Sequence, residues 1–424
     1  MILTLEVRRA RKGDCLLLHY GTKTAPKLML IDAGPSGVYQ PQLAPRLDAI
    51  RAARQLTSQD TLGVDVIMVS HVDDDHIKGI LDLTKKLTTQ KKDQEPLYLK
   101  TKTLWHNSFD DVLETTPVEL KEAGFGPATM NVVVNDTTDP DELYRSKVLA
   151  SIPQGRTLRD DAAALRKSSS SWKVNDISNG KLILATATGG KIDIGGGVKI
   201  TVVGPLRSDL VKLQEEHDKF LKKKKKSGPA AAAILAAYVD NSAANLSSIV
   251  VLVEKNKKRI LFTGDARGDK TLEGLKLTKL LGKKASDRIH VDILKVPHHG
   301  SANNVELAFF KKVTADHYVF SGNGEHGNPE RETIEMLLAA RPTATFTMHF
   351  TYPIDEIDVA READWKKEQA KEIAKGKPVR PDWDPAVNGL RVVIDGLDAN
   401  RHTVTTIDAD ATGRVLNLLS PIAF

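Results

Sequence analysis

One stretch, residues 64–79, constrains the fold of this chain more than any other. It begins with an apolar run rich in β-branched residues, Val64–Val69, which predicts a buried strand. Apolar residues at helical spacing from Ile77 onwards predict a helix after it. The turn between strand and helix carries the following acidic and imidazole residues: His71, Asp73, Asp74, Asp75 and His76. Because α/β folds bind their ligands at the carboxyl ends of strands, the stretch predicts an α/β protein with a site at one sheet edge.

The residue types in this turn predict a metal site. Alternate residues of an extended chain share a face, so His71, Asp73 and Asp75 point the same way, and His76 follows at the start of the helix. Three carboxylates and two imidazoles crowded together would repel or titrate without a cation to neutralise them. The alternative is a solvated acidic turn in which Asp73 or Asp75 caps the helix.

Two later strands also end in residues that can bind metal. The predicted strand Arg259–Phe262 is followed by Thr263-Gly264-Asp265. The predicted strand Val291–Val296 is followed by Pro297-His298-His299. A histidine pair is seldom mere packing, so these two strand ends favour the metal site over the solvated turn.

Together these stretches resemble the metallo-β-lactamase superfamily. Residues 71–76 match its signature His-x-His-x-Asp-His, with Asp73 in place of the second histidine. That variant resembles the competence-type branch, the hydrolase domain attached to bacterial DNA-uptake channels. The other stretches that carry this resemblance, which runs from the N-terminus to about Asn328, are Gly13-Asp14, Leu30–Gly34, Phe262–Ala266 and Lys295–Ser301. The resemblance implies a four-layer αββα sandwich with helical and loop insertions.

The resemblance also implies a centre for two divalent metal ions, zinc or manganese. The expected ligands are His71 and Asp73 on one ion, Asp75, His76 and His299 on the other, and Asp265 between them. Either histidine of the pair can be the ligand; we favour His299, leaving His298 to face the substrate. The wider superfamily supplies a further histidine near Asn245–Ser248, and this chain has none there. Asp73 makes the ligand set harder, which makes manganese a rival to zinc.

Further residues receive roles from the same resemblance. Asp75, Asp265 and His298 are expected to take part in the chemical step, and Asp32 to orient the metal-binding turn, although an ordinary turn aspartate is nearly as consistent. The candidates for substrate contact are His106, Asn245, Ser301 and His326. For His106 a structural histidine is an equal alternative, and for His326 an ordinary loop histidine is the stronger one.

The expected function is metal-dependent hydrolysis, most simply of a phosphodiester such as nucleic acid. Bound metal lowers the pKa of water to about 7, which gives a hydroxide nucleophile at neutral pH. The run Lys222–Lys226 is either a solvated segment or an arm that contacts phosphates. The alternatives are hydrolysis of a small ester, lactam or phosphodiester, and a metal-binding partner protein that has lost turnover.

Composition limits the remaining classes. Apolar residues make up 41% and charged residues 27%, as in ordinary globular proteins, and a net charge of +6 permits a nucleic-acid partner without requiring one. The run Ala230–Val239 is too short to cross a bilayer. The single cysteine, Cys15, indicates a reducing compartment, so we expect a cytoplasmic protein.

The expected domain organisation is one hydrolase domain over residues 1–340, with insertions at about 110–180 and 206–244. Residues 341–424 hold strands and a charged segment, 355–388, and are expected to complete the same domain. Strands are predicted, among others, at 181–186 and 390–395.

Overall fold

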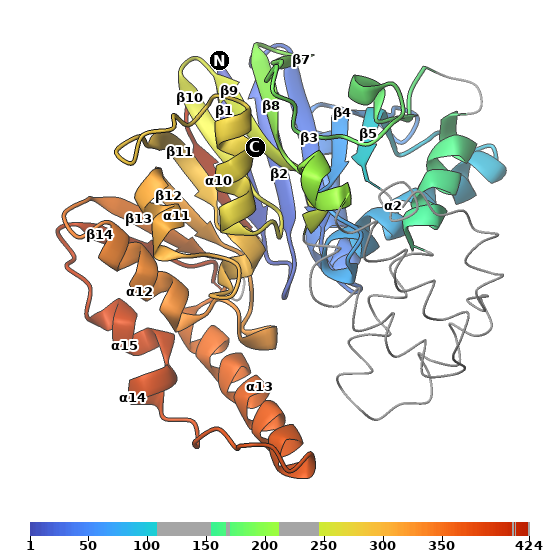
Figure 1. The fold of residues 1–424 in the computed structure, drawn as a ribbon. Coiled ribbons are helices and arrows are strands. Elements are labelled where there is room, and N and C mark those ends of the chain that lie inside the picture. Colours follow the sequence, from blue (N-terminus) through green and yellow to red (C-terminus); the bar gives the residue numbers. More distant parts are fainter. Residues whose placement is uncertain (108–153, 167–169, 212–245, 409–410, 412, 423–424) are drawn as a thin grey trace, which may run out of the picture.

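The chain folds into two mixed β-sheets that pack face to face, in a computed structural model that describes residues 1–107, 154–166, 170–211, 246–408, 411 and 413–422. Helices cover the outer face of each sheet, so that the layers follow the order αββα (Figure 1). This confirms the fold class expected from the sequence. The predicted strand that leads to the histidine-rich turn lies in the first sheet, and the strands that lead to Asp265 and His299 lie in the second.

The first sheet has seven strands in the order β15-β1-β2-β3-β4-β5-β6. Pairing is antiparallel from β15 to β3 and parallel from β3 to β6. The bounds are β1 (Ile2–Arg8), β2 (Cys15–Gly21), β3 (Pro26–Ala33), β4 (Leu62–Val69), β5 (Leu99–His106), β6 (Lys173–Val174) and β15 (Gly413–Asn417).

The second sheet has eight strands in the order β14-β13-β12-β11-β10-β9-β8-β7. Pairing is antiparallel from β7 to β10 and parallel from β10 to β14. The bounds are β7 (Ile192–Gly195), β8 (Val198–Gly204), β9 (Val250–Lys255), β10 (Lys258–Phe262), β11 (Ile289–Lys295), β12 (Val313–Phe320), β13 (Phe346–Phe350) and β14 (His402–Thr405).

Helices connect the parallel strands and lie on the outside (Figure 1). None of the helices in the described part of the chain combines the length and apolar character that a bilayer span requires. Their bounds are α1 (Ala44–Ala53), α2 (Asp74–Lys92), α10 (Gly268–Leu277), α11 (Leu307–Lys312), α12 (Arg331–Ala340), α13 (Ile354–Ala374), α14 (Pro385–Asn388) and α15 (Leu390–Asp395). Residues 154–166 are also helical.

Side-chain alternation along the strands builds three apolar layers. On β1, Leu3, Leu5 and Val7 face the second sheet and pack in one cluster with residues of β9 such as Val251 and Val253. A second cluster joins the first sheet to α1 and α2, and a third joins the second sheet to α10, α11 and α12. The sandwich is therefore closed on both sides by buried apolar surface.

Two predicted strands are wrong, and tertiary contacts explain both. Residues 390–395 form helix α15, because the Asp358 carboxylate accepts hydrogen bonds from the backbone N–H groups of Leu390 and Arg391, at 2.8 and 2.9 Å, and so caps its first turn. Residues 181–186 form no strand; the Asn107 side chain instead bonds both backbone groups of Ile183.

Candidate metal centre

The candidate centre lies where strands of the two sheets end at one edge of the sandwich. Strand β4 leads into the turn 70–73 and then α2, whose first turn contains Asp75. Strands β10 and β11 lead into Asp265 and the histidine pair. The backbone N–H of Ile249 donates to the Ser70 carbonyl at 2.8 Å and joins the two sheets at this edge.

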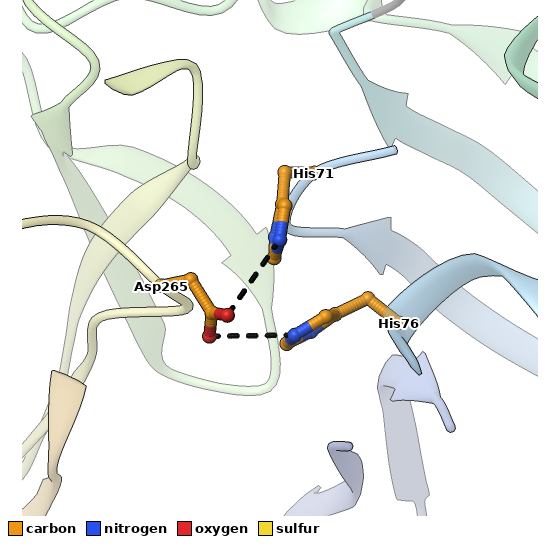
Figure 2. Close-up of side chains that lie close together, drawn as sticks. All are labelled: His71, His76 and Asp265. Carbon is orange, nitrogen blue, oxygen red and sulfur yellow. Dashed lines mark ion pairs between the residues drawn. The ribbon is translucent and has the colours of Figure 1, made fainter. Parts of the chain in front are cut away.

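Asp265 contacts four histidines, two of which, His71 and His76, are drawn with it in Figure 2. Its Oδ1 lies 3.3 Å from His76 Nε2 and 3.4 Å from His299 Nε2. Its Oδ2 lies 3.7 Å from His71 Nε2 and 3.5 Å from His298 Nε2. The two oxygens of one carboxylate therefore face different sets of histidines, which is the arrangement expected of a ligand shared by two ions.

The remaining ligand atoms fall into overlapping groups around Asp265. Ligand atoms of His71, Asp73 and Asp75 all lie within 4.8 Å of one another, and so do those of Asp75, His76 and His299. Asp75 was expected in an extended turn; it reaches the same place from the first turn of α2 instead. The structure thus brings together all six residues that the sequence analysis named as metal ligands.

Unpaired buried atoms show that the cluster fits a cation. Within the described residues, no hydrogen-bond partner satisfies these buried atoms: Nε2 of His71, Nε2 of His76, Nε2 of His299, Oδ1 of Asp73 and Oδ1 of Asp265. Buried polar atoms left without partners are rare and costly. In a tetrahedral zinc site with bonds of about 2.0–2.1 Å, ligand atoms lie roughly 3.4 Å apart. The separations around Asp265 match that spacing.

The helix-cap alternative for the acidic turn is not supported. Asp73 occupies the N-cap position of α2, but its side chain accepts no capping hydrogen bond. Its Oδ2 lies 3.6 Å from His71 Nε2 instead. The Asp73 carboxylate therefore turns towards the histidines and not towards the helix.

Asp32 orients two of the histidines. It adopts a left-handed conformation, with φ of 53°, at the end of β3. Its carboxylate accepts hydrogen bonds from the Ser70 hydroxyl and backbone N–H, both at 2.7 Å, and lies 2.8 Å from Nδ1 of His76. Because the Ser70 hydroxyl donates to Asp32, its oxygen is left to accept from Nδ1 of His71, at 3.1 Å. Both rings then present Nε2 to the centre, as metal-binding histidines do.

A separate chain of contacts orients His299. Its Nδ1 lies 3.1 Å from the Ser321 hydroxyl, which donates to the buried carboxylate of Asp14. Asp14 in turn pairs with the buried ammonium of Lys295 at 2.6 Å. Burial raises the pKa of Asp14, but Lys295, His299 and His76 together outweigh burial and lower the pKa below its ordinary value. No role was predicted for Lys295; the signal that could have found it is a lysine at the end of a largely apolar strand.

The electrostatics of the cluster favour a bound cation. Burial lowers the pKa of His76, but the carboxylates of Asp265 and Asp32 outweigh it and raise the pKa well above its ordinary value. Burial raises the pKa of Asp265, but the imidazoles of His299, His76 and His298 lower it well below. The carboxylate is therefore held as an anion in surroundings that demand positive charge.

A half-open cavity of about 290 Å³ gives access to the cluster. Its lining residues are Lys12, Asp73, Asp74, Asp75, Asp265, His298, His299, Ser301, Asn303, Glu325, His326, Asn328 and Glu330. His71 and His76 lie fully buried beneath it. The cavity thus places the ligand cluster at the floor of an accessible site.

Three of the four candidates for substrate contact can be placed. Ser301 and His326 line the cavity, and the Ser301 hydroxyl donates to Glu330 at 3.0 Å. His106 is fully buried at the end of β5 and does not line the cavity; burial lowers its pKa to about 3, so its imidazole is neutral. Asn245 lies outside the described residues, as does the run Lys222–Lys226, and their roles stay predictions.

The histidine pair has an unusual backbone. Both His298 (φ 46°, ψ 51°) and His299 (φ 54°, ψ 15°) lie in the left-handed region. Consecutive non-glycine residues in this region are strained, and such strain collects at functional sites. The turn places Nε2 of His299 on one oxygen of Asp265 and leaves His298, with 24% of its side chain exposed, at the cavity wall.

Replacing Asp32 with asparagine tests the orientation of His76. Asparagine tolerates the left-handed backbone, so the turn should be retained. We expect a 10–100-fold loss of metal affinity, because the imidazole loses its charged partner. Competition with a metal-sensitive dye measures the metal affinity. The matched control is Asp48→Asn, because Asp48 lies on α1 and outside the cavity. Equal affinity in Asp32→Asn and wild type would assign Asp32 to the turn alone.

Comparisons with known proteins give local and distant likenesses. No protein-family model matches the chain. It is 33% identical over 76 residues to microtubule-associated protein 1A of Homo sapiens, covering 18% of this chain and 3% of that protein. It is 40% identical over 62 residues to microtubule-associated protein futsch of Drosophila melanogaster, covering 15% of this chain and 1% of that protein. The chain therefore matches only a small fraction of the length of these relatives.

Two solved structures are similar over most of the chain. Zn(2+)-bound PqqB from Methylobacterium extorquens is 10% identical, with a TM-score of 0.33, over 98% of this chain and 100% of the other. A protein of unknown function from Enterococcus faecalis V583 is 10% identical, with a TM-score of 0.25, over 97% and 89%. The fold assignment rests on the sheet order and layers of the chain itself.

Proposed function

We propose that this protein is a metal-dependent hydrolase of the metallo-β-lactamase fold, related to its competence-type branch, and that it cleaves phosphodiesters such as those of nucleic acid. One observation carries the proposal: the Asp265 carboxylate directs Oδ1 towards His76 and His299, and Oδ2 towards His71 and His298. A carboxylate shared in this way, with unpaired imidazole nitrogens on both sides, fits a pair of divalent ions.

Each residue of the centre receives a role from its position. His71 and Asp73 would hold one ion, Asp75, His76 and His299 the other, and Asp265 both. Asp32 and Ser321 hold the imidazoles in place. Bound divalent ions polarise a phosphoryl oxygen and make water a nucleophile at neutral pH. His298 and Ser301 line the cavity and are assigned to the substrate.

Charge supports an anionic substrate. Two divalent cations against the three carboxylates of Asp73, Asp75 and Asp265 leave a net charge of +1 at the floor of the cavity. Phosphodiesters are anions, and metal clamps on phosphoryl oxygens stabilise the charge that develops during their hydrolysis. Asp73 in place of a histidine supports manganese beside zinc as the resident metal.

A metal-reconstitution assay tests the proposal. Wild type, loaded with zinc or manganese after chelation, is expected to bind up to two ions and to hydrolyse at least one of plasmid DNA, single-stranded DNA, RNA and bis(p-nitrophenyl) phosphate. His71→Ala should lose metal and activity together. His290→Ala, on an exposed face of β11, is the control. Absence of bound metal from the wild type would refute the metal centre, and bound metal without turnover would leave a metal-binding partner protein.

A further inference from the structure

Lys12 and His326 meet at the mouth of the cavity. The ammonium of Lys12 lies 3.0 Å from Nε2 of His326, and both residues line the same cavity as Asp75, Asp265 and His298. Lys12 belongs to the turn between β1 and β2 in the first sheet. His326 belongs to the short helical turn Glu325–Gly327 that follows β12 in the second sheet. The contact therefore joins the two sheets above the candidate metal centre.

The charge of Lys12 acts on two carboxylates, Asp75 and Glu325, without an ion pair to either. An ammonium group has donors and no acceptor, so Nε2 of His326 is the acceptor in this contact. The neighbouring Glu325 carboxylate is engaged by Arg11, at 2.9 and 3.2 Å, and by the Asn323 amide at 2.9 Å. Among the residues that the structure describes, no ion pair involves Lys12. An ammonium group without an ion pair to any described carboxylate therefore stands at the mouth of a largely acidic cavity.

The backbone around Lys12 is fixed against the metal-binding turn. The N–H of Asp14 donates to the Asp75 carbonyl at 3.3 Å. A Cβ on Gly13 would lie 1.9 Å from that carbonyl oxygen, so only glycine allows this approach. Burial and the Asp265 carboxylate raise the pKa of Asp75, but His76, His299 and, to a smaller extent, the Lys12 ammonium outweigh them and lower it. Lys12 thus acts electrostatically on a predicted metal ligand.

The opposite side of the mouth is fixed as well. The backbone N–H of Arg11 donates to the Tyr352 hydroxyl at 2.7 Å, while its guanidinium holds Glu325 in the turn that carries His326. A Cβ on Gly324 would lie 2.3 Å from the Ile357 carbonyl oxygen of α13. The backbone segments that carry Lys12 and His326 are therefore held in place on both sides of the mouth.

We propose that Lys12, supported by His326, forms an anion subsite at the cavity mouth that binds a phosphate group of the substrate next to the one at the metal centre. The inference rests on the proposed function and deepens it, because it selects substrates with adjacent phosphates over those with a single anionic group. Lys12 donates its remaining N–H groups to phosphate oxygens, and His326 holds the ammonium over the cavity. Such charge-assisted hydrogen bonds are among the stronger contacts a protein makes to phosphate.

Calorimetric titration of the metal-loaded protein with pyrophosphate tests the subsite. Lys12→Met is expected to weaken pyrophosphate binding about tenfold at low salt, because one charge-assisted contact is lost, and the difference should shrink as salt rises. Lys12→Arg should restore most of the affinity, since it returns the cation. Lys23→Met, in the exposed turn between β2 and β3 and away from the cavity, is the matched control. Metal content measured on each sample shows whether the centre below is intact.

The outcomes separate the subsite from the proposed function. Equal pyrophosphate affinity in wild type and Lys12→Met, or no binding by wild type, overturns the subsite and leaves the hydrolase proposal to its own assay. A tenfold effect in a protein that cleaves no phosphodiester keeps the subsite and removes the hydrolase. Loss of metal in Lys12→Met, with no rescue by arginine, would show that Lys12 serves the metal-binding turn and not the ligand.

Discussion

Replacing Asp265 with asparagine is expected to abolish the paired metal centre and to lower the rate of hydrolysis about 10³-fold. A loss of this size corresponds to the several kcal/mol of transition-state stabilisation that metal ions contribute to such reactions. Asparagine has nearly the same shape, but it cannot carry the negative charge that four imidazoles face. Elemental analysis should find at most one ion per chain in the variant. Circular dichroism should show an unchanged fold, because no apolar contact is removed.

Asp269→Asn provides the matched control. Asp269 lies four residues further on, in the first turn of α10, where its carboxylate pairs with Arg267 at 3.0 Å and does not line the cavity. The Asp269→Asn variant should retain both its metal ions and its activity. Two ions per chain in Asp265→Asn would remove Asp265 from the centre, and with it the observation on which the proposed function rests.

Replacing Glu6 with glutamine is expected to destabilise the fold by roughly 3 kcal/mol at pH 7. Glu6 is buried on the helix-facing side of β1, where it accepts hydrogen bonds from Arg8 and Arg46 and lies 3.1 Å from His19 Nε2. Burial raises the pKa of Glu6, but His19 and the two guanidinium groups outweigh burial and lower the pKa from the ordinary 4.5 to about 2. Glutamine leaves the guanidinium groups of Arg8 and Arg46 without their anion.

The sign of the pH dependence follows from the lowered pKa. Ionised Glu6 contributes its full stability above pH 4.5 and loses it as the pH falls towards 2. Urea unfolding of metal-free protein should therefore show a gap between wild type and Glu6→Gln that is largest at pH 6–7 and smaller near pH 3. Glu356→Gln, whose partner Arg9 lies at 2.6 Å on a more exposed surface, should change the free energy of unfolding by less than about 1 kcal/mol. A gap that is constant with pH would mean that the charge of Glu6 contributes nothing.

The candidate centre was predictable because its parts are local. The turn 71–76, Asp265 and the histidine pair each follow a strand with a clear apolar pattern, and the resemblance to a known family grouped them although β4 lies in the first sheet and β10 and β11 in the second. Contacts between the sheets that belong to no such motif were not predictable in this way. Lys12 and His326 are 314 positions apart, and no local pattern indicates that they meet.

Elements that depend on distant partners were the ones misassigned or missed. The run at 390–395 is rich in β-branched residues, yet a carboxylate on α13 caps it as a helix. Strand β15 was not predicted, because its residues pair with β1 and carry no strong pattern of their own. The secondary structure of such elements depends on their tertiary contacts, which the intrinsic propensities of the residues do not describe.

The position of β15 gives the first sheet a dependence on the order of synthesis. β1 lies between β2 and β15, and the Thr4 hydroxyl donates to the Asn417 side chain at 2.7 Å across 413 positions. At 5–20 residues per second, roughly 20–80 s pass between the emergence of β1 and that of β15 from the ribosome. Throughout that interval β1 has one unpaired edge, which is a template for pairing with another chain. We therefore expect the edge of β1 to stay open to such pairing in the nascent chain until residues 413–417 arrive.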